Sequence, residues 1–134
     1  MSKTEKQASI LVADDAEGQR LVLEMLLSVD GYDVVTVGDG KEALEYLKEH
    51  TPDLAILDVR MPHMSGLDVC HRMKRIPRLK DVPVLILTAL RDEETMTHAR
   101  MAHADSVVFK PLEGKDFRAT VRELLAGGSP APLP

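Results

Sequence analysis

Short apolar runs and amphipathic helical segments alternate along this chain, and their alternation is the feature that most limits how it can fold. Five runs have the aliphatic and β-branched character of buried strands, at residues 9–13, 32–37, 54–58, 83–87 and 106–109. A segment with helical periodicity follows each run after a short connection. Because strand–helix–strand crossovers are right-handed, such a chain is expected to form a parallel sheet with helices on both faces.

The helical segments carry apolar residues at spacings of three and four, as amphipathic helices do. The first segment has them at Leu21, Val22, Met25, Leu26 and Val29. The other four helices are expected at residues 41–50, 67–75, 92–102 and 115–126. Five strands are too few for an eight-fold barrel. The predicted fold is α/β, a doubly wound five-stranded parallel sheet of order 2-1-3-4-5 with a flavodoxin-like arrangement.

Length and composition favour one domain. The 134 residues suffice for a single buried core, which is expected over residues 9–126, between a flexible N-terminus at 1–8 and a flexible tail or linker start at 127–134. The net charge of −5 and the lack of a Lys/Arg block argue against direct nucleic-acid binding. No run approaches the length of a membrane span or of a signal-peptide core. A cytoplasmic protein without membrane contact is expected.

Four of the five runs end in a side chain that can do chemistry. Asp14-Asp15 follow the first run, Asp58 closes the third, Thr88 ends the fourth and Lys110 follows the fifth. In a parallel sheet these ends share one edge, where open α/β sheets bind ligands. Three carboxylates gathered there would repel one another unless cations lay close by. Lys110 supplies one positive charge, and Mg²⁺, a hard cation that prefers oxygen ligands, would supply the rest.

Such a cluster has the parts of a phosphoryl-transfer site. A metal ion, an ammonium group and a hydroxyl would surround the phosphoryl oxygens, leaving one carboxylate as the nucleophile. No plausible general base for water is evident, so the site is expected to accept a phosphoryl group rather than to turn over a substrate quickly. Glycine-rich nucleotide-binding motifs are absent from the sequence. The five histidines show no convincing metal-ligand spacing, and the single cysteine, Cys70, is expected to be a small buried hydrophobe.

The motifs at these strand ends resemble the receiver domain of two-component response regulators. The matching segments are Asp14-Asp15, residues 57–66 (LDVRMPHMSG), residues 87–89 (LTA) and Lys110-Pro111. The likeness runs from about residue 9 to about residue 126. It implies a phosphoacceptor signalling domain rather than an enzyme, with self-phosphorylation and slow self-dephosphorylation as its only reactions. A histidine kinase or histidine phosphotransfer protein would be the donor.

The resemblance also assigns a role to each residue of the site. Asp58 would be the phosphoacceptor. The Mg²⁺ ligands would be Asp15, Asp58 and the main-chain carbonyl of Arg60, with Asp14 acting largely through water. Thr88 would form a hydrogen bond to the phosphoryl group, Lys110 would pair with it, and the Lys110-Pro111 bond would be cis.

Output would follow from a conformational change of the face formed by the fourth helix, fifth strand and fifth helix. A downstream protein or output domain would read that change, and a homodimer is possible. This chain departs from the family on that face, because Val107 stands where an aromatic residue is common. Ala102-His103-Ala104 also replaces the usual glycine after the fourth helix, so His103 is expected to take a left-handed conformation. Activation is therefore expected to shift the helix at residues 92–102 while Val107 keeps its rotamer.

Two other functions fit parts of the pattern. A haloacid-dehalogenase-like phosphatase also uses a strand-end Asp with Mg²⁺, Thr and Lys, but it needs a second Asp two residues on, where this chain has Arg60. A receiver-like interaction module that is never phosphorylated is the other alternative. The joint presence of the acidic residues, Thr88 and Lys110 argues against that module.

Overall fold

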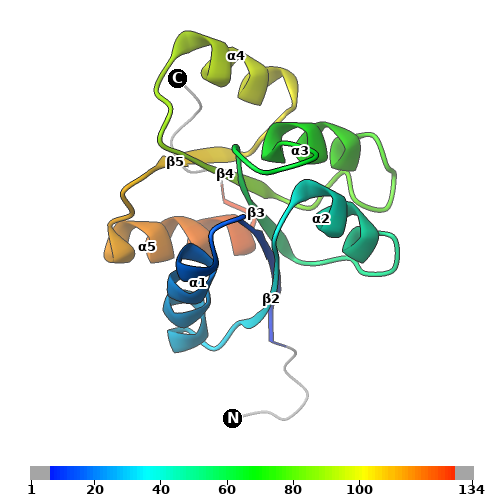
Figure 1. Cartoon of the computed structure of the whole chain (residues 1–134). Coiled ribbons are helices and arrows are strands. Elements are labelled where there is room, and N and C mark those ends of the chain that lie inside the picture. Colours follow the sequence, from blue (N-terminus) through cyan, green and yellow to red (C-terminus); the bar gives the residue numbers. More distant parts are fainter. Residues whose placement is uncertain (1–6, 129–134) are drawn as a thin grey trace.

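The computed structural model describes residues 7–128, which form a parallel sheet of strand order β2-β1-β3-β4-β5 covered by helices (Figure 1). The strands are β1 (Ser9–Ala13), β2 (Asp33–Val37), β3 (Leu54–Asp58), β4 (Val84–Thr88) and β5 (Ser106–Phe109). The helices are α1 (Glu17–Val29), α2 (Gly40–Leu47), α3 (Gly66–Lys74), α4 (Glu93–Met101) and α5 (Gly114–Leu125). The predicted fold class and strand order are confirmed.

The predicted ends of the domain are not tested to the same degree. Residues 1–6 of the expected flexible N-terminus and residues 129–134 of the expected tail lie outside the described residues. The domain boundaries of 9–126 stay a prediction.

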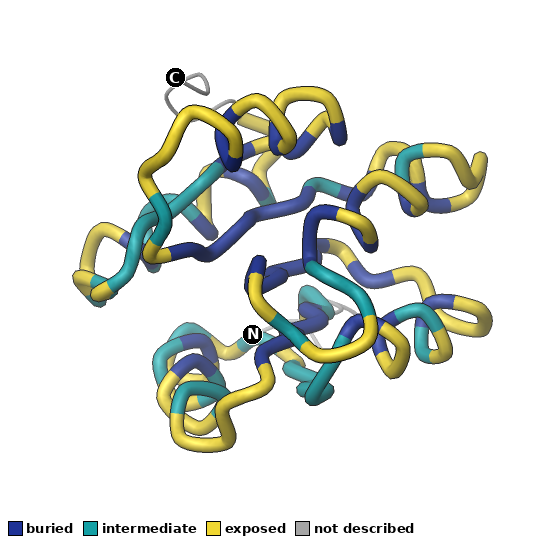
Figure 2. The backbone as a smooth tube through the Cα atoms, turned by 45° about the horizontal axis from the view of Figure 1, so that its top comes forward, coloured by how far each residue is buried: buried dark blue, intermediate teal, exposed yellow. Residues whose placement is uncertain are grey.

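Two apolar layers sandwich the sheet. Helices α1 and α5 cover one face, where Leu23, Leu27 and Phe117 pack against alternate strand residues. Helices α2, α3 and α4 cover the other face, with Leu47 and Met73 in that layer. Strands β3 and β4 are buried along their whole length, which explains their continuous apolar sequence. In Figure 2 the buried central strands are flanked by helices that are exposed on their outer sides.

Helix α1 carries apolar residues on two sides. The side buried in the core is not the one marked by most of the apolar residues that predicted the helix. Leu23 and Leu27 are fully buried, whereas Leu21 and Met25 are each 61% exposed. Both sets satisfy the helical period, so the period identifies the helix but not the face that is buried. The helix is confirmed, but most of the residues that mark it in the sequence do not build the core.

Helix α4 is held to the sheet by few apolar side chains, as its sequence indicated. Met96 and Ala99 are buried under it together with Thr95. Asp92 caps its first turn by accepting a hydrogen bond from the Thr95 N–H at 3.2 Å. At its other end His103 has a φ of 62°, so the left-handed conformation expected there is confirmed.

Candidate functional site

The sheet register brings the predicted site residues to one edge. Ala13 and Leu57 are register partners, so Asp14 and Asp58 follow neighbouring positions of β1 and β3. Between β4 and β5 the Lys110 N–H donates to the Thr88 carbonyl oxygen at 2.9 Å. Residues separated by up to 96 positions in sequence thus meet where the strands end.

Three carboxylates form an acidic cluster there, made of Asp14, Asp15 and Asp58. Each offers an oxygen atom, and these atoms all lie within 4.8 Å of one another. Asp14 is fully buried and its Oδ1 accepts a hydrogen bond from the Ala16 N–H at 3.0 Å, whereas Asp15 is exposed. Clustered hard oxygen ligands at the mouth of a cleft suit Mg²⁺. The residues present therefore fit this ion.

Lys110 bridges the two buried carboxylates. Its Nζ lies 3.3 Å from Asp58 Oδ2 and 3.4 Å from Asp14 Oδ2. Burial raises the pKa of Asp58, and the nearby charge of Asp14 raises it further, while the Lys110 ammonium opposes both effects. The ionised form of Asp58 is therefore less favourable in the folded protein than in a free side chain, and additional positive charge would favour it.

Thr88 presents its hydroxyl beside the acidic cluster. The side chain is buried, and its Oγ1 accepts a hydrogen bond from the Leu90 N–H at 2.9 Å. A hydroxyl has one proton to donate and lone pairs to accept, so Thr88 can still donate to a further acceptor. Its position suits a hydrogen bond to a group bound at Asp58.

These side chains line one hollow of about 300 Å³. Its lining consists of Asp15, Asp58, Arg60, Thr88, Ala89, Leu90 and Lys110. Every residue of this lining except Leu90 belongs to the motifs from which the sequence predicted the site. Asp14 does not line the hollow, because it lies buried against Lys110. Because Asp14 still lies 3.4 Å from Lys110 Nζ, the structure brings together all the residues predicted to share the site.

The turn after β3 needs a glycine to hold Asp58 in place. A Cβ at Gly66 would overlap the Asp58 carbonyl oxygen, so no other residue fits without moving that backbone. Ser65 then starts α3 by accepting a hydrogen bond from the Asp68 N–H at 3.1 Å. On the opposite side of the site the Lys110-Pro111 peptide bond is cis, as the resemblance implied.

One contact beside the site was not anticipated from the sequence. The Arg91 guanidinium carbon lies 4.1 Å from the centroid of the Phe109 ring. Arg91 follows Thr88 by three residues, and Phe109 directly precedes Lys110. In the sequence, the only signal was that Arg91 and Phe109 each lie close to a motif residue. That signal does not predict a contact between Arg91 and Phe109.

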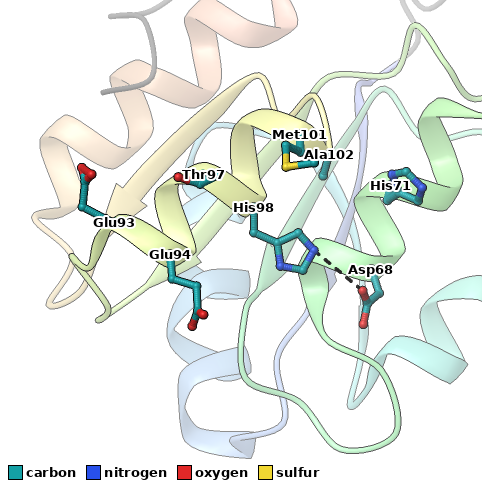
Figure 3. Close-up of a pocket in the computed structure, with 8 residues that line it drawn as sticks. All are labelled: Asp68, His71, Glu93, Glu94, Thr97, His98, Met101 and Ala102. Atoms are coloured by element: carbon teal, nitrogen blue, oxygen red, sulfur yellow. Dashed lines mark ion pairs between the residues drawn. The ribbon is translucent and has the colours of Figure 1, made fainter.

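A larger hollow, of about 650 Å³, lies between α3 and α4 (Figure 3). Its lining consists of Asp68, His71, Glu93, Glu94, Thr97, His98, Met101 and Ala102. The imidazole of His98 points toward Asp68, with Nε2 4.0 Å from Oδ1. None of the predicted site residues reaches this hollow, so its size alone does not make it the chemical centre.

Comparison with known families finds a match to the response regulator receiver domain over residues 10–122. A curated relative, the probable transcriptional regulator ycf27 of Porphyridium aerugineum, is 38% identical over 120 residues, covering 90% of this chain and 49% of that protein. The transcriptional regulatory protein AfsQ1 of Streptomyces coelicolor is 35% identical over 120 residues, covering 90% of this chain and 52% of that protein. The chain thus spans about half the length of the curated relatives it matches.

A solved structure gives the same result from geometry. The signal receiver domain of a signal transduction histidine kinase from Syntrophus aciditrophicus superimposes with a TM-score of 0.86 at 33% identity, covering 93% of this chain and 95% of that one. Similar domains therefore occur both in transcriptional regulators and in a histidine kinase. Among the described residues no helix is long and apolar enough to cross a membrane.

Proposed function

This chain belongs to the response regulator receiver family of two-component signalling, and from that membership we propose that Asp58 is its phosphoacceptor. The phosphoryl group would come from a phosphorylated histidine on a kinase or a phosphotransfer protein. An Asp58 carboxylate oxygen attacks phosphorus, the bond from phosphorus to the donor nitrogen breaks, and that nitrogen keeps the electron pair. The product is an aspartyl phosphate on this chain.

The observation that carries the proposal is the different surroundings of the three carboxylates. Asp58 lines the hollow and lies 3.3 Å from Lys110 Nζ, so an incoming phosphoryl group can reach it beside a positive charge. Asp14 is fully buried, with one oxygen accepting from the Ala16 N–H and the other facing Lys110. Asp15 is exposed at the rim. Of the three, Asp58 is the carboxylate best placed to act as the nucleophile.

The remaining residues would hold the phosphoryl group once it is transferred. The Lys110 ammonium pairs with one phosphoryl oxygen and the Thr88 hydroxyl donates to another. Before transfer, the Leu90 N–H donates to Thr88 Oγ1. Asp14, Asp15, Asp58 and the main-chain carbonyl of Arg60 would hold Mg²⁺, which neutralises charge on the phosphoryl oxygens when bound. Because Asp58 has a raised pKa, nearby positive charge also favours the ionised nucleophile.

The competing functions lack a residue or leave residues unexplained. A phosphatase of the haloacid-dehalogenase type needs a carboxylic acid two residues after the nucleophile, and Arg60 occupies that position. The described residues that line the hollow include no histidine that could activate water. We therefore infer slow loss of the phosphoryl group and no turnover of other substrates. An unphosphorylated interaction module would have no use for the converging Asp58, Thr88 and Lys110.

The partners follow from the same proposal. A histidine kinase or phosphotransfer protein supplies the phosphoryl group in the cytoplasm, and a downstream protein or output region reads the face of α4, β5 and α5. Relatives about twice as long as this chain include transcriptional regulators, which fits such an output. A homodimer is a further possible output.

Incubation with phosphoramidate and Mg²⁺, followed by intact-mass measurement, tests the proposal. The wild-type protein should gain one acid-labile phosphoryl group, and Asp58→Asn should gain none. Asp81→Asn is the matched control, because it makes the same chemical change at an exposed position that does not line the hollow. Equal labelling of Asp58→Asn and Asp81→Asn would refute Asp58 as the acceptor.

A further inference from the structure

The contact between Arg91 and Phe109 joins two segments that each carry a phosphoryl-binding residue. Arg91 lies in the β4–α4 loop, three residues after Thr88, and Phe109 ends β5 immediately before Lys110. Thr88 and Phe109 are register partners on adjacent strands. The guanidinium carbon lies 4.1 Å from the ring centroid, a distance at which a cation and an aromatic face attract each other. The contact therefore holds the β4–α4 loop against the edge strand.

Phe109 lies on the same side of β5 as Val107, because side chains two residues apart on a strand share a face. Val107 packs against the apolar layer under α2, α3 and α4, whereas Phe109 belongs to neither apolar layer of the described residues. Phe109 is half-buried and Arg91 lies over its ring. The aromatic ring of β5 in this chain is thus at the strand end, covered by an exposed cation.

The β4–α4 loop is bonded to the hydroxyl that would meet the phosphoryl group. The Leu90 N–H donates to Thr88 Oγ1 at 2.9 Å, and Arg91 is the next residue. A Thr88 hydroxyl that turns toward a group on Asp58 either carries Leu90 with it or loses this bond. Either outcome changes the constraint that this bond places on the backbone next to Arg91.

A second set of partners for the guanidinium lies close by. Arg91 shares a hollow of about 210 Å³ with Glu113 and Asp116, at the start of α5. Both carboxylates are on exposed residues, so an arginine leaving the ring meets negative charge nearby. The side chain therefore has two alternative placements, one over β5 and one toward α5.

We propose that the Arg91–Phe109 contact is a conformational latch, which holds the β4–α4 loop in the unphosphorylated protein and opens when Thr88 bonds the phosphoryl group. This inference rests on the proposed function of Asp58. Opening moves Arg91 toward Glu113 and Asp116 and uncovers the Phe109 ring on the face of α4, β5 and α5. The latch takes the place of a swinging aromatic residue at position 107.

Ring-current shifts in NMR spectra of the full chain report the latch directly. Side-chain protons of Arg91 should be shifted upfield in the free protein and should lose that shift in Phe109→Leu. Addition of beryllofluoride with Mg²⁺, as a stable phosphoryl mimic, should abolish the shift in wild type but not in Asp58→Asn.

The outcomes separate the latch from the function on which it rests. If beryllofluoride perturbs the Thr88 and Leu90 amides in an Asp58-dependent way while the Arg91 shift persists, the latch is wrong and the phosphoacceptor proposal survives. If no Asp58-dependent perturbation occurs, the phosphoacceptor proposal fails and the latch fails with it.

A double-mutant cycle on phosphorylation by phosphoramidate gives a second readout. A latch that favours the unphosphorylated loop slows phosphorylation, so Arg91→Met and Phe109→Leu should each raise the rate about two- to five-fold. The double variant should be no faster than either single variant, because both changes remove one contact. Arg75→Met, an arginine at the end of α3 that does not line the hollow, should leave the rate unchanged. Fully multiplicative effects in the double variant would overturn the latch.

Discussion

Replacing His103 by glycine should stabilise this protein, and the structure gives the size of the effect. His103 follows α4 with a φ of 62°, in the left-handed region that disfavours a side chain. Its N–H donates to the Arg100 carbonyl at 3.0 Å and the Ala104 N–H donates to the Ala99 carbonyl at 3.1 Å. This pair of bonds is the Schellman motif, in which the residue after the helix is usually glycine.

The magnitude is the difference between two backbone terms. Left-handed backbone costs a residue with a Cβ about 1–2 kcal/mol, and His103→Gly removes that cost. Glycine in turn loses about 0.5–1 kcal/mol more than other residues through its freedom in the unfolded chain. The imidazole offsets little of the gain, because no hydrogen bond or ion pair joins it to any described residue. The midpoints of these two ranges give a net stabilisation of about 0.7 kcal/mol, and their extremes give about 0 to 1.5 kcal/mol.

The end of α1 supplies the matched control. Gly31 there has a φ of 83°, and its N–H donates to the Ser28 carbonyl at 2.9 Å. No atom lies within 4 Å of where a Cβ at Gly31 would be, so Gly31→Ala introduces backbone strain without a clash. It should destabilise the protein by about the amount that His103→Gly stabilises it.

Urea unfolding followed by circular dichroism measures the change in stability of both variants. Each change should appear as a shift of the unfolding midpoint, with the dependence of the unfolding free energy on urea concentration unaltered. A destabilised His103→Gly variant would refute the reasoning. So would a stabilised Gly31→Ala variant.

Three further predictions concern the core and the site. Leu23→Ala should lower the free energy of unfolding by about 2–5 kcal/mol, whereas Leu21→Ala on the exposed side of α1 should change it by less than about 0.5 kcal/mol. Equal losses in urea melts would contradict the burial of Leu23 rather than Leu21. Asp15→Asn should weaken Mg²⁺ binding measured by calorimetry while the fold survives, and an unchanged affinity would place the metal elsewhere. Because the folded-state pKa of Asp58 is raised, its ionisation costs stability as the pH rises from the unfolded pKa through the folded one. At neutral pH and without metal, Asp58→Asn should therefore be more stable than wild type, and the difference should shrink as the pH falls. A difference that does not depend on pH would show that ionisation of Asp58 is not its cause.

The strand ends were predictable because they are a local property of the sequence. An apolar run that stops at Asp58 or Thr88 fixes where the side chain lies on a buried parallel strand, and parallel topology then gathers the ends. The left-handed His103 was also predictable, since the helical pattern of α4 stops at that position.

The sequence could not choose between two faces that satisfy the same helical period. In α1, Leu21 and Leu23 are both apolar, and only the packing of the whole sheet decides that Leu23 is buried. Contacts between a loop and a neighbouring strand are harder still to foresee. Arg91 and Phe109 meet because β4 and β5 are neighbours and the β4–α4 loop turns back over the strand end. No spacing rule links an arginine to an aromatic residue across two strands.

Identification of the phosphorylated residue tests the central claim most directly. After reaction with phosphoramidate and Mg²⁺, borohydride reduces an aspartyl phosphate to homoserine, which peptide sequencing by mass spectrometry locates along the chain. We predict homoserine at position 58 and at no other aspartate. Homoserine at position 14 or 15, or at no aspartate of a protein that has gained a phosphoryl group, would contradict the role of Asp58.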